Sequence, residues 1–209
     1  MSTCGVAGGV TVVPKLRLYG LIILVLALLS ATAGGPADAA QSCPGQKYVQ
    51  PFVPWGDNND YVLMPKGSLE STSGWQLSGS AKLVSGNEPW KVNSSKDSNS
   101  LSLPSGSSAT TPTGCISLEY PFMRFFIANS GSSTATLKVE AITTVNGSQL
   151  TLTIGNLTAG SAWQPSDQLF VGLNFLNLTP GVIAFRFTPV GSNSGWRIDD
   201  VYLDPFKQR

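Results

Sequence analysis

The 209-residue chain contains no histidine. Without an imidazole it cannot build a Ser-His-Asp or Cys-His catalytic site, a histidine-ligated metal centre, or the usual general base near neutral pH. It also lacks the G-x-S-x-G turn and the glycine-rich phosphate-binding loop. A catalyst with this sequence would have to work through carboxylates, as a glycosidase or lyase does, with Glu88 and Glu119 as candidates. We regard an enzyme as the least favoured function.

Charge is also scarce, with 12% charged residues and a formal net charge of +1. Outside the first forty residues, which hold Lys15, Arg17 and Asp38, acidic and basic residues are equal in number. No run of five like charges occurs. Because nucleic acids and anionic membranes select a basic patch, neither is an expected partner.

Long apolar runs are absent after the N-terminal segment. There, Lys15 and Arg17 precede a twelve-residue apolar run at 18–29, which is followed by small residues. As a helix this run would rise about 18 Å, short of a bilayer core of roughly 30 Å. We therefore expect residues 1–40 to be a signal peptide cleaved near residue 33 or 39, and the protein to be secreted, extracellular or associated with the cell envelope. An uncleaved anchor is the alternative, because the apolar run could extend to residue 33.

Cysteine is rare, with three residues, of which Cys4 lies in the expected signal peptide. Cys43 and Cys115 remain, and in an oxidising compartment a disulfide between them is the expected state. The long loop that it would close corresponds to about 4 kcal/mol of stabilisation in the chain-entropy model. Two buried free thiols are the alternative.

Glycine and proline, by contrast, are abundant, with 22 and 14 residues. They separate short segments whose side chains alternate between apolar and polar, a pattern typical of β-strands. Asn146-Gly147 lies between two such segments and predicts a hairpin turn. No later segment keeps the 3.6-residue apolar period of a helix. The sequence therefore predicts an all-β antiparallel sandwich, with strands expected at 100–104, 115–119, 120–128, 136–145, 149–155 and 182–190.

Residues 41–66 differ from the rest because they contain four prolines and little alternation. We expect them to form an extended arm that lies over the sandwich and is fixed through Cys43. The sandwich domain itself is expected at 67–209. Within it, the polar segment 105–114 is expected to be a mobile surface loop.

Two motifs carry a family resemblance. "GSLESTSGWQLSGSAKLVSGNE" (67–88) and "GWRIDDVYLDP" (195–205) resemble the opening and closing strands of jelly-roll, galactose-binding-like carbohydrate-binding modules attached to bacterial xylanases and glucanases. Leu69 departs from that pattern, which usually has Phe. The chain is also similar to uncharacterised exported actinobacterial proteins that end in RIDDVYxDP. The resemblance implies a non-catalytic module that recognises polysaccharide or cell-surface glycan. A structural or protein-interaction domain of the cell envelope, without a sugar site, is the alternative.

The pair Asp199-Asp200 lies in the middle of an apolar strand. Regular pairing would place one carboxylate beside an aliphatic residue on whichever face is buried. A β-bulge resolves this conflict, because Ile198 and Val201 then both face inward. The resemblance implies a structural Ca²⁺ ion there, held between Glu70 and Asp200, with Asp199 at the same bulge. The alternative is that the aspartates pair with an arginine or a turn amide and bind no metal.

Sugars stack on exposed aromatic rings and hydrogen-bond to amides and carboxylates. Trp90, in a polar loop with Asn87 and Glu88, is the first candidate for such a contact, and Trp163 is the second. Either ring could instead cover the core. The other tryptophans are assigned to packing: Trp75 in the core, Trp196 half-buried, and Trp55 clamping the arm together with Tyr61.

Overall fold

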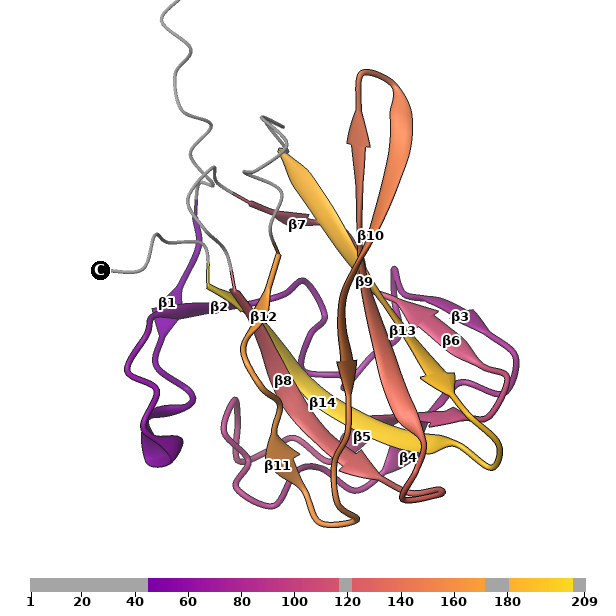
Figure 1. The fold of residues 1–209 in the computed structure, drawn as a ribbon. Coiled ribbons are helices and arrows are strands. Elements are labelled where there is room, and N and C mark those ends of the chain that lie inside the picture. Colours follow the sequence, from indigo (N-terminus) through magenta and orange to yellow (C-terminus); the bar gives the residue numbers. More distant parts are fainter. Residues whose placement is uncertain (1–44, 117–121, 172–180, 205–209) are drawn as a thin grey trace, which may run out of the picture. The chain divides into compact units, whose positions relative to one another are not determined.

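The computed structural model describes residues 45–116, 122–171 and 181–204. The expected signal peptide, Cys43 and Glu119 lie outside these ranges. The described residues form strands and one short 3-10 helix, arranged in two antiparallel sheets (Figure 1), which confirms the predicted fold class. None of them forms a helix long and apolar enough to span a bilayer.

The larger sheet is organised around the last strand. This strand, β14, pairs along one edge with β5 and then β2, and along its other edge with β8. The sheet comprises β1 (Tyr48–Val49), β2 (Tyr61–Leu63), β14 (Gly195–Asp204), β5 (Asn99–Pro104), β4 (Lys82–Ser85), β8 (Phe122–Asn129), β11 (Gln164–Pro165) and β12 (Leu169–Phe170).

The second sheet carries the predicted hairpin. Asn146 and Gly147 form its turn with φ values of 49° and 78°, the left-handed conformation that this dipeptide accepts. The segment 105–114 is not only a surface loop, since it contains a strand whose Ala109 is fully buried. The sheet comprises β10 (Ser148–Leu157), β9 (Thr136–Val145), β13 (Val182–Val190), β6 (Ser108–Thr110), β3 (Gln76–Ser78) and β7 (Gly114–Cys115).

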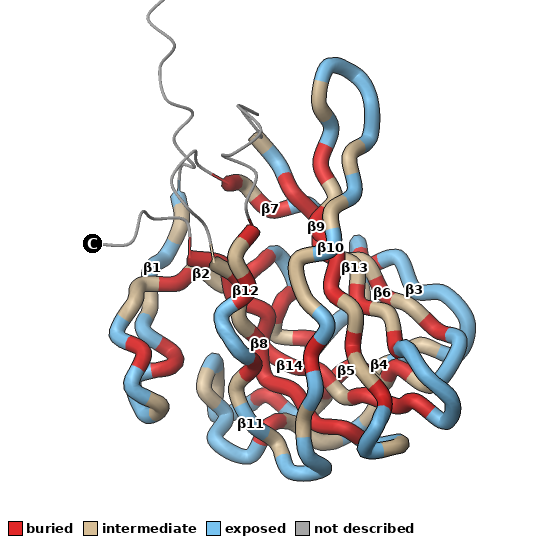
Figure 2. The backbone as a smooth tube through the Cα atoms, viewed as in Figure 1, coloured by how far each residue is buried: buried red, intermediate tan, exposed pale blue. Residues whose placement is uncertain are grey.

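The main core lies between the two sheets (Figure 2). The alternation of β13 places Phe185 and Phe187 in it, both fully buried, as predicted. Trp75 stacks against Phe187 and its indole N–H donates to the carbonyl of Lys66 (3.1 Å), which confirms its core position. Trp196, expected to be half-buried, is fully buried.

The predicted β-bulge is present in β14. Asp199 pairs with Phe126, and the next pair along the strand joins Tyr202 to Arg124, so β14 carries one extra residue. Asp200 takes a left-handed conformation with φ 43°. Ile198 and Val201 consequently both enter the core and are fully buried.

The arm is more closely integrated than the sequence predicted. Its strand β2 pairs with β14 beyond the bulge, so the arm extends the larger sheet. Figure 1 shows this strand beside the end of β14. A second, smaller core forms between arm and sheet from fully or almost fully buried rings: Phe52, Tyr61, Phe126 and Tyr202.

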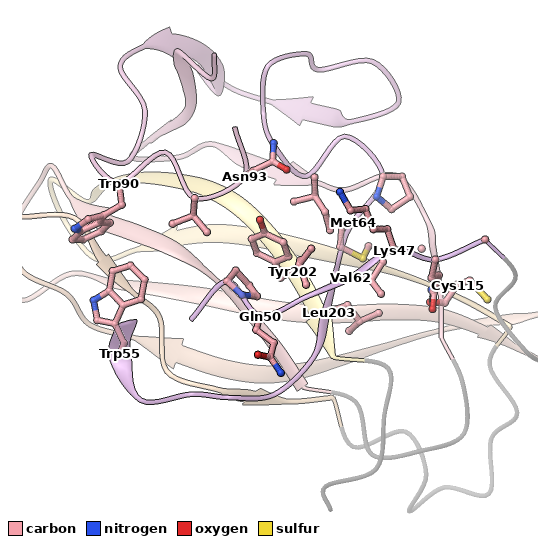
Figure 3. A pocket seen from close by; sticks show the side chains of 18 of the residues that line it. Lys47, Gln50, Trp55, Val62, Met64, Trp90, Asn93, Cys115, Tyr202 and Leu203 are labelled. Atoms are coloured by element: carbon pink, nitrogen blue, oxygen red, sulfur yellow. The ribbon is translucent and has the colours of Figure 1, made fainter. Parts of the chain in front are cut away.

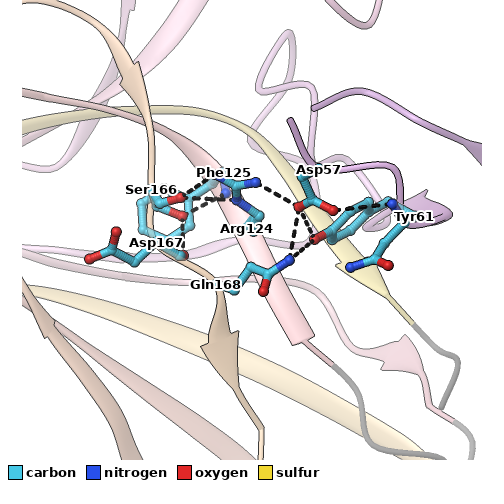
Figure 4. Close-up of polar contacts among 8 residues, drawn as sticks. Asp57, Tyr61, Arg124, Phe125, Ser166, Asp167 and Gln168 are labelled. Atoms are coloured by element: carbon cyan, nitrogen blue, oxygen red, sulfur yellow. Dashed lines mark hydrogen bonds and ion pairs between the residues drawn. The ribbon is translucent and has the colours of Figure 1, made fainter. Parts of the chain in front are cut away.

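A buried ionic network fastens this arm to β8 (Figure 4). Asp57 Oδ2 accepts hydrogen bonds from Arg124 Nη1 (2.6 Å), the Tyr61 hydroxyl (2.7 Å) and Gln168 Nε2 (3.0 Å). Arg124 also donates to the Ser166 carbonyl. Burial opposes ionisation of Asp57, but these hydrogen bonds outweigh it and lower the pKa of its carboxyl. The network therefore holds a charged pair at the arm's turn.

We expect Asp57→Asn to lower the free energy of unfolding by about 3 kcal/mol or more, because the Arg124 guanidinium loses its buried counter-charge. Urea unfolding measures the change. The control is Lys138→Gln, which removes a more exposed ion pair with Glu140 and should cost at most about 1 kcal/mol. Equal losses in the two variants would contradict a locking role for Asp57.

Candidate functional site

A groove of about 790 Å³ lies between the arm, the loop after β4 and the end of β14 (Figure 3). The arm contributes one wall and Tyr202 and Leu203 contribute the floor. Most lining side chains are apolar, while polar groups stand among them: Gln46, Lys47, Gln50 and Asn93. An apolar groove with a few polar groups is the usual form of a small-molecule or oligosaccharide site.

Two tryptophans mark one end of the groove. Trp90, predicted as the first ligand contact, is 46% exposed and lies edge-to-face with Trp55 at 4.8 Å and 80° between the ring planes. Figure 3 shows both rings together, away from Cys115 at the other end. Trp55 was assigned to packing alone and was missed as a groove residue. It packs on Phe126 (5.4 Å) and lines the groove as well.

The loop that carries Trp90 is held from within by Glu88. This carboxylate is fully buried and accepts hydrogen bonds from the backbone N–H groups of Trp90 (2.6 Å) and Val92. Glu88, predicted as a ligand contact, thus directs its oxygens toward the loop backbone and is not among the residues that line the groove. Asn87 donates to the Glu88 carbonyl and carboxylate and does not line the groove.

The two bulge aspartates hold the same loop from β14. Asp199 Oδ2 accepts from the N–H of Glu88 (3.0 Å), and Asp200 Oδ2 accepts from the N–H of Asn93 (3.1 Å). Neither carboxylate faces solvent. The irregular strand and the groove wall are thus joined through hydrogen bonds from backbone amides to the side chains of the two aspartates.

Five carboxylates gather around this bulge: Glu70, Glu88, Asp97, Asp199 and Asp200. No ion pair joins any of them to a lysine or arginine within the ranges that the structure describes. Burial, together with the charge of Asp200, raises the pKa of Asp199 to about 8. Burial and the charge of Glu88 raise the pKa of Asp200 to about 7. Burial and the charge of neighbouring acids therefore oppose ionisation of the two aspartates.

The donor set suits a hard cation in part. Asp200 Oδ1 is buried and has no hydrogen-bond partner among the described residues, so its lone pairs are available. Glu70, by contrast, accepts four hydrogen bonds from Ser98 and Asn99 and would have to exchange one of them for an ion. No three acidic side chains of the described part converge into a ready metal cage. An ion here would complete its shell with backbone carbonyls and water, as Ca²⁺ commonly does.

The other predicted site residues are distributed elsewhere. Trp163 does not line the groove; its ring lies under the Arg197 guanidinium at 5.4 Å and packs beside the smaller core. Cys115 lies in β7, and its carbonyl accepts from Gln46 of the arm (3.3 Å). Because Cys43 lies outside the described residues, the disulfide stays a prediction. So does any role of Glu119.

A second hollow, of about 510 Å³, crosses the outer face of the six-stranded sheet. Its lining is rich in threonine, includes Gln76, Gln149 and Arg186, and has no aromatic ring among the described residues. It lacks a stacking surface for a sugar. The groove at Trp90 is the better candidate.

Comparison with known proteins supports the fold. No protein-family model and no curated protein sequence matches the chain. Among solved structures, the xylan-binding domain CBM22-1 of Paenibacillus barcinonensis Xyn10C is 13% identical, with a TM-score of 0.50, over 72% of this chain and 97% of that one. TmCBM61 in complex with β-1,4-galactotriose is 15% identical, with a TM-score of 0.45, over 70% and 98%.

A family 11 carbohydrate-binding module from Clostridium thermocellum, in complex with a β-1,3-1,4-mixed-linked tetrasaccharide, is 14% identical, with a TM-score of 0.40, over 70% and 97%. At 13% identity the likeness to the CBM22-1 domain concerns the fold alone, a jelly-roll β-sandwich. The resemblance to exported actinobacterial proteins stays a prediction, since neither a family model nor a curated sequence supports it.

The raised pKa values give a pH dependence with a definite sign. In the unfolded chain both aspartates ionise near pH 3.8, whereas in the folded state they keep their protons to about pH 7 and 8. In chelator, the free energy of unfolding should therefore fall as pH rises from about 5 to 8, by up to about 1.4 kcal/mol per pH unit for each retained proton. Urea unfolding at several pH values measures this slope. Asp200→Asn should make it shallower, and an equal slope in that variant would contradict the assignment.

Proposed function

We propose that the chain is an exported, non-catalytic module that binds polysaccharide or cell-surface glycan in the groove between the arm and the eight-stranded sheet. The observation that carries this proposal is the exposed Trp90 ring, braced against Trp55 at the end of a groove of about 790 Å³. The part of this ring that stays exposed to water is apolar surface whose burial would be favourable. Binding an apolar sugar face would bury it.

The composition of the groove supports a neutral glycan. Of the described residues that line it, Lys47 carries the only cationic side chain and none carries a carboxylate, so hydrogen bonding and stacking would dominate. Asn93, Gln50 and Tyr202 all line the groove and bring polar groups to it. The two tryptophan rings are nearly perpendicular, so one ring would stack while the other supports it. This arrangement favours one strong sugar subsite over an extended flat platform.

Trp90→Ala tests the groove. We expect it to weaken glycan binding about five-fold or more, because loss of one stacked ring corresponds to roughly 1 kcal/mol or more. A glycan array followed by calorimetry with xylan, β-1,4-galactan and mixed-linkage glucan gives the measurement.

The matched control for this test is Leu77→Ala, which removes another partly exposed apolar side chain from β3 of the opposite sheet. It should bind as the wild type does. Retained binding in Trp90→Ala would move the site elsewhere, with Trp163→Ala as the next variant. No binding by the wild type to any glycan would favour the structural or protein-interaction role.

We also propose a structural Ca²⁺ ion at the bulge, with Asp200 as its first ligand and Asp199 and Glu70 beside it. The support is the unpartnered Asp200 Oδ1 and the clustered carboxylates that lack a cationic side chain in the described part. The ion would supply positive charge that favours the ionised form of these acids.

Addition of 1 mM Ca²⁺ to chelated protein should raise the thermal midpoint by several degrees, since a ligand that binds only the folded state stabilises it. The increase should be larger at pH 8 than at pH 5, because ionised aspartates bind the ion best. Scanning calorimetry provides the measurement, with Asp200→Asn as the control that should not respond. An unchanged midpoint at both pH values would exclude the ion.

A further inference from the structure

The wall of the groove rests on the acid cluster through three neighbouring residues. Trp90, Val92 and Asn93 all line the groove. The backbone N–H of each donates to a buried carboxylate: the first two to Glu88 and the third to Asp200. The position of this wall therefore depends on carboxylates that face away from the groove.

These carboxylates are linked to one another in series. Asp199 accepts from the N–H of Glu88, and the N–H of Asp200 donates to Asp199. Asp200 and Glu88 carry like charges that interact unfavourably. Each of these carboxylates also accepts a hydrogen bond from the backbone of the loop 86–98. We therefore expect a change in the net charge at the bulge to change the position of this loop.

Asp200 is the carboxylate of this cluster that has a free oxygen for a cation. Its Oδ2 holds Asn93, while its Oδ1 is fully buried and has no partner among the described residues. Oxygen donors select a hard cation, and Ca²⁺ accepts irregular coordination more readily than Mg²⁺. A cation on Oδ1 would offset the repulsion between Asp200 and Glu88 without touching a ligand in the groove.

We propose that the loop 86–98 couples two sites: a Ca²⁺ ion at Asp200 orders the wall that presents Trp90, Val92 and Asn93, so that ion and glycan each strengthen the binding of the other. Both halves of this statement rest on the proposed function, which includes a glycan in the groove and a Ca²⁺ ion at the bulge. Linkage requires the coupling to be reciprocal, with the same factor in both directions. Glu88 acts as the positioning residue, since it connects Asp199 to the N–H groups of Trp90 and Val92.

The first test uses no glycan. Amide hydrogen exchange of the wild-type chain is compared in chelator and in 1 mM Ca²⁺, with Ca²⁺ binding measured by calorimetry on the same sample. The amides of Trp90, Val92 and Asn93 should exchange at least ten-fold more slowly with Ca²⁺, relative to the amides of the β9–β10 hairpin. Ca²⁺ that fails to bind, or that binds and leaves these three amides unchanged, would overturn the coupling.

The second test adds the glycan. Its affinity should be at least five-fold higher in Ca²⁺ than in chelator, and the glycan should raise the Ca²⁺ affinity by the same factor. Glu88→Gln should still bind Ca²⁺ but lose the slowed exchange at Trp90 and the Ca²⁺ dependence of glycan binding. Glu140→Gln, a buried acid on the other sheet, is the matched control and should keep both.

The two failures are distinguishable. Absence of glycan binding with and without Ca²⁺ counts against the proposed function, while the exchange measurement still decides whether the ion orders the loop. Glycan binding of equal affinity in both conditions overturns the coupling and leaves the proposed function standing. Because the wild-type comparison needs no variant, misfolding of Glu88→Gln would not remove the test.

Discussion

The structure depends on one backbone irregularity, the extra residue at Asp199–Asp200. It lies in β14, the central strand of the larger sheet, which has paired strands along both of its edges. Without the extra residue, Ile198 and Val201 could not both enter the core, and the segment that pairs with the arm would present its opposite face. The bulge turns two carboxyl groups away from solvent, where backbone amides of the loop 86–98 bind one oxygen of each and the N–H of Asp200 binds the second oxygen of Asp199. Core packing, arm docking and loop position therefore follow from one local departure from regular pairing.

The groove is a product of the arm as much as of the sandwich. Its wall opposite Trp90's loop comes from residues before β3, which reach their place through pairing with β14 and through the ionic network at Asp57. Trp55 packs against the buried rings of the smaller core, which fixes it in its edge-to-face contact with Trp90. A charged pair under the arm costs desolvation, but it also selects one docking geometry for a segment rich in proline. The arm is consequently part of the candidate site.

Period-two alternation predicted most long strands closely, including β9 and β13. The Asn146-Gly147 pair predicted the hairpin turn between β9 and β10. The bulge was also predictable, because two acids inside an apolar strand conflict with regular pairing. The pairing of the arm was not, since contacts between residues 61–63 and 202–203 leave no local pattern. Glu88 looked like an exposed loop acid, and nothing in its neighbourhood in sequence indicated that backbone amides would enclose it. Trp55 could have been suspected from its place beside a glycine turn, but packing and binding tryptophans share that signal.

The pairing of β2 with β14 has a consequence for how the chain reaches its native state. It joins segments separated by almost the whole described sequence, and such non-local contacts form late because loop closure precedes any gain in stability. Until the final strand is in place, the early segment has no edge to pair with and the smaller aromatic core lacks Tyr202. The groove, which needs both the arm and the end of β14, would therefore form only in the last step of folding.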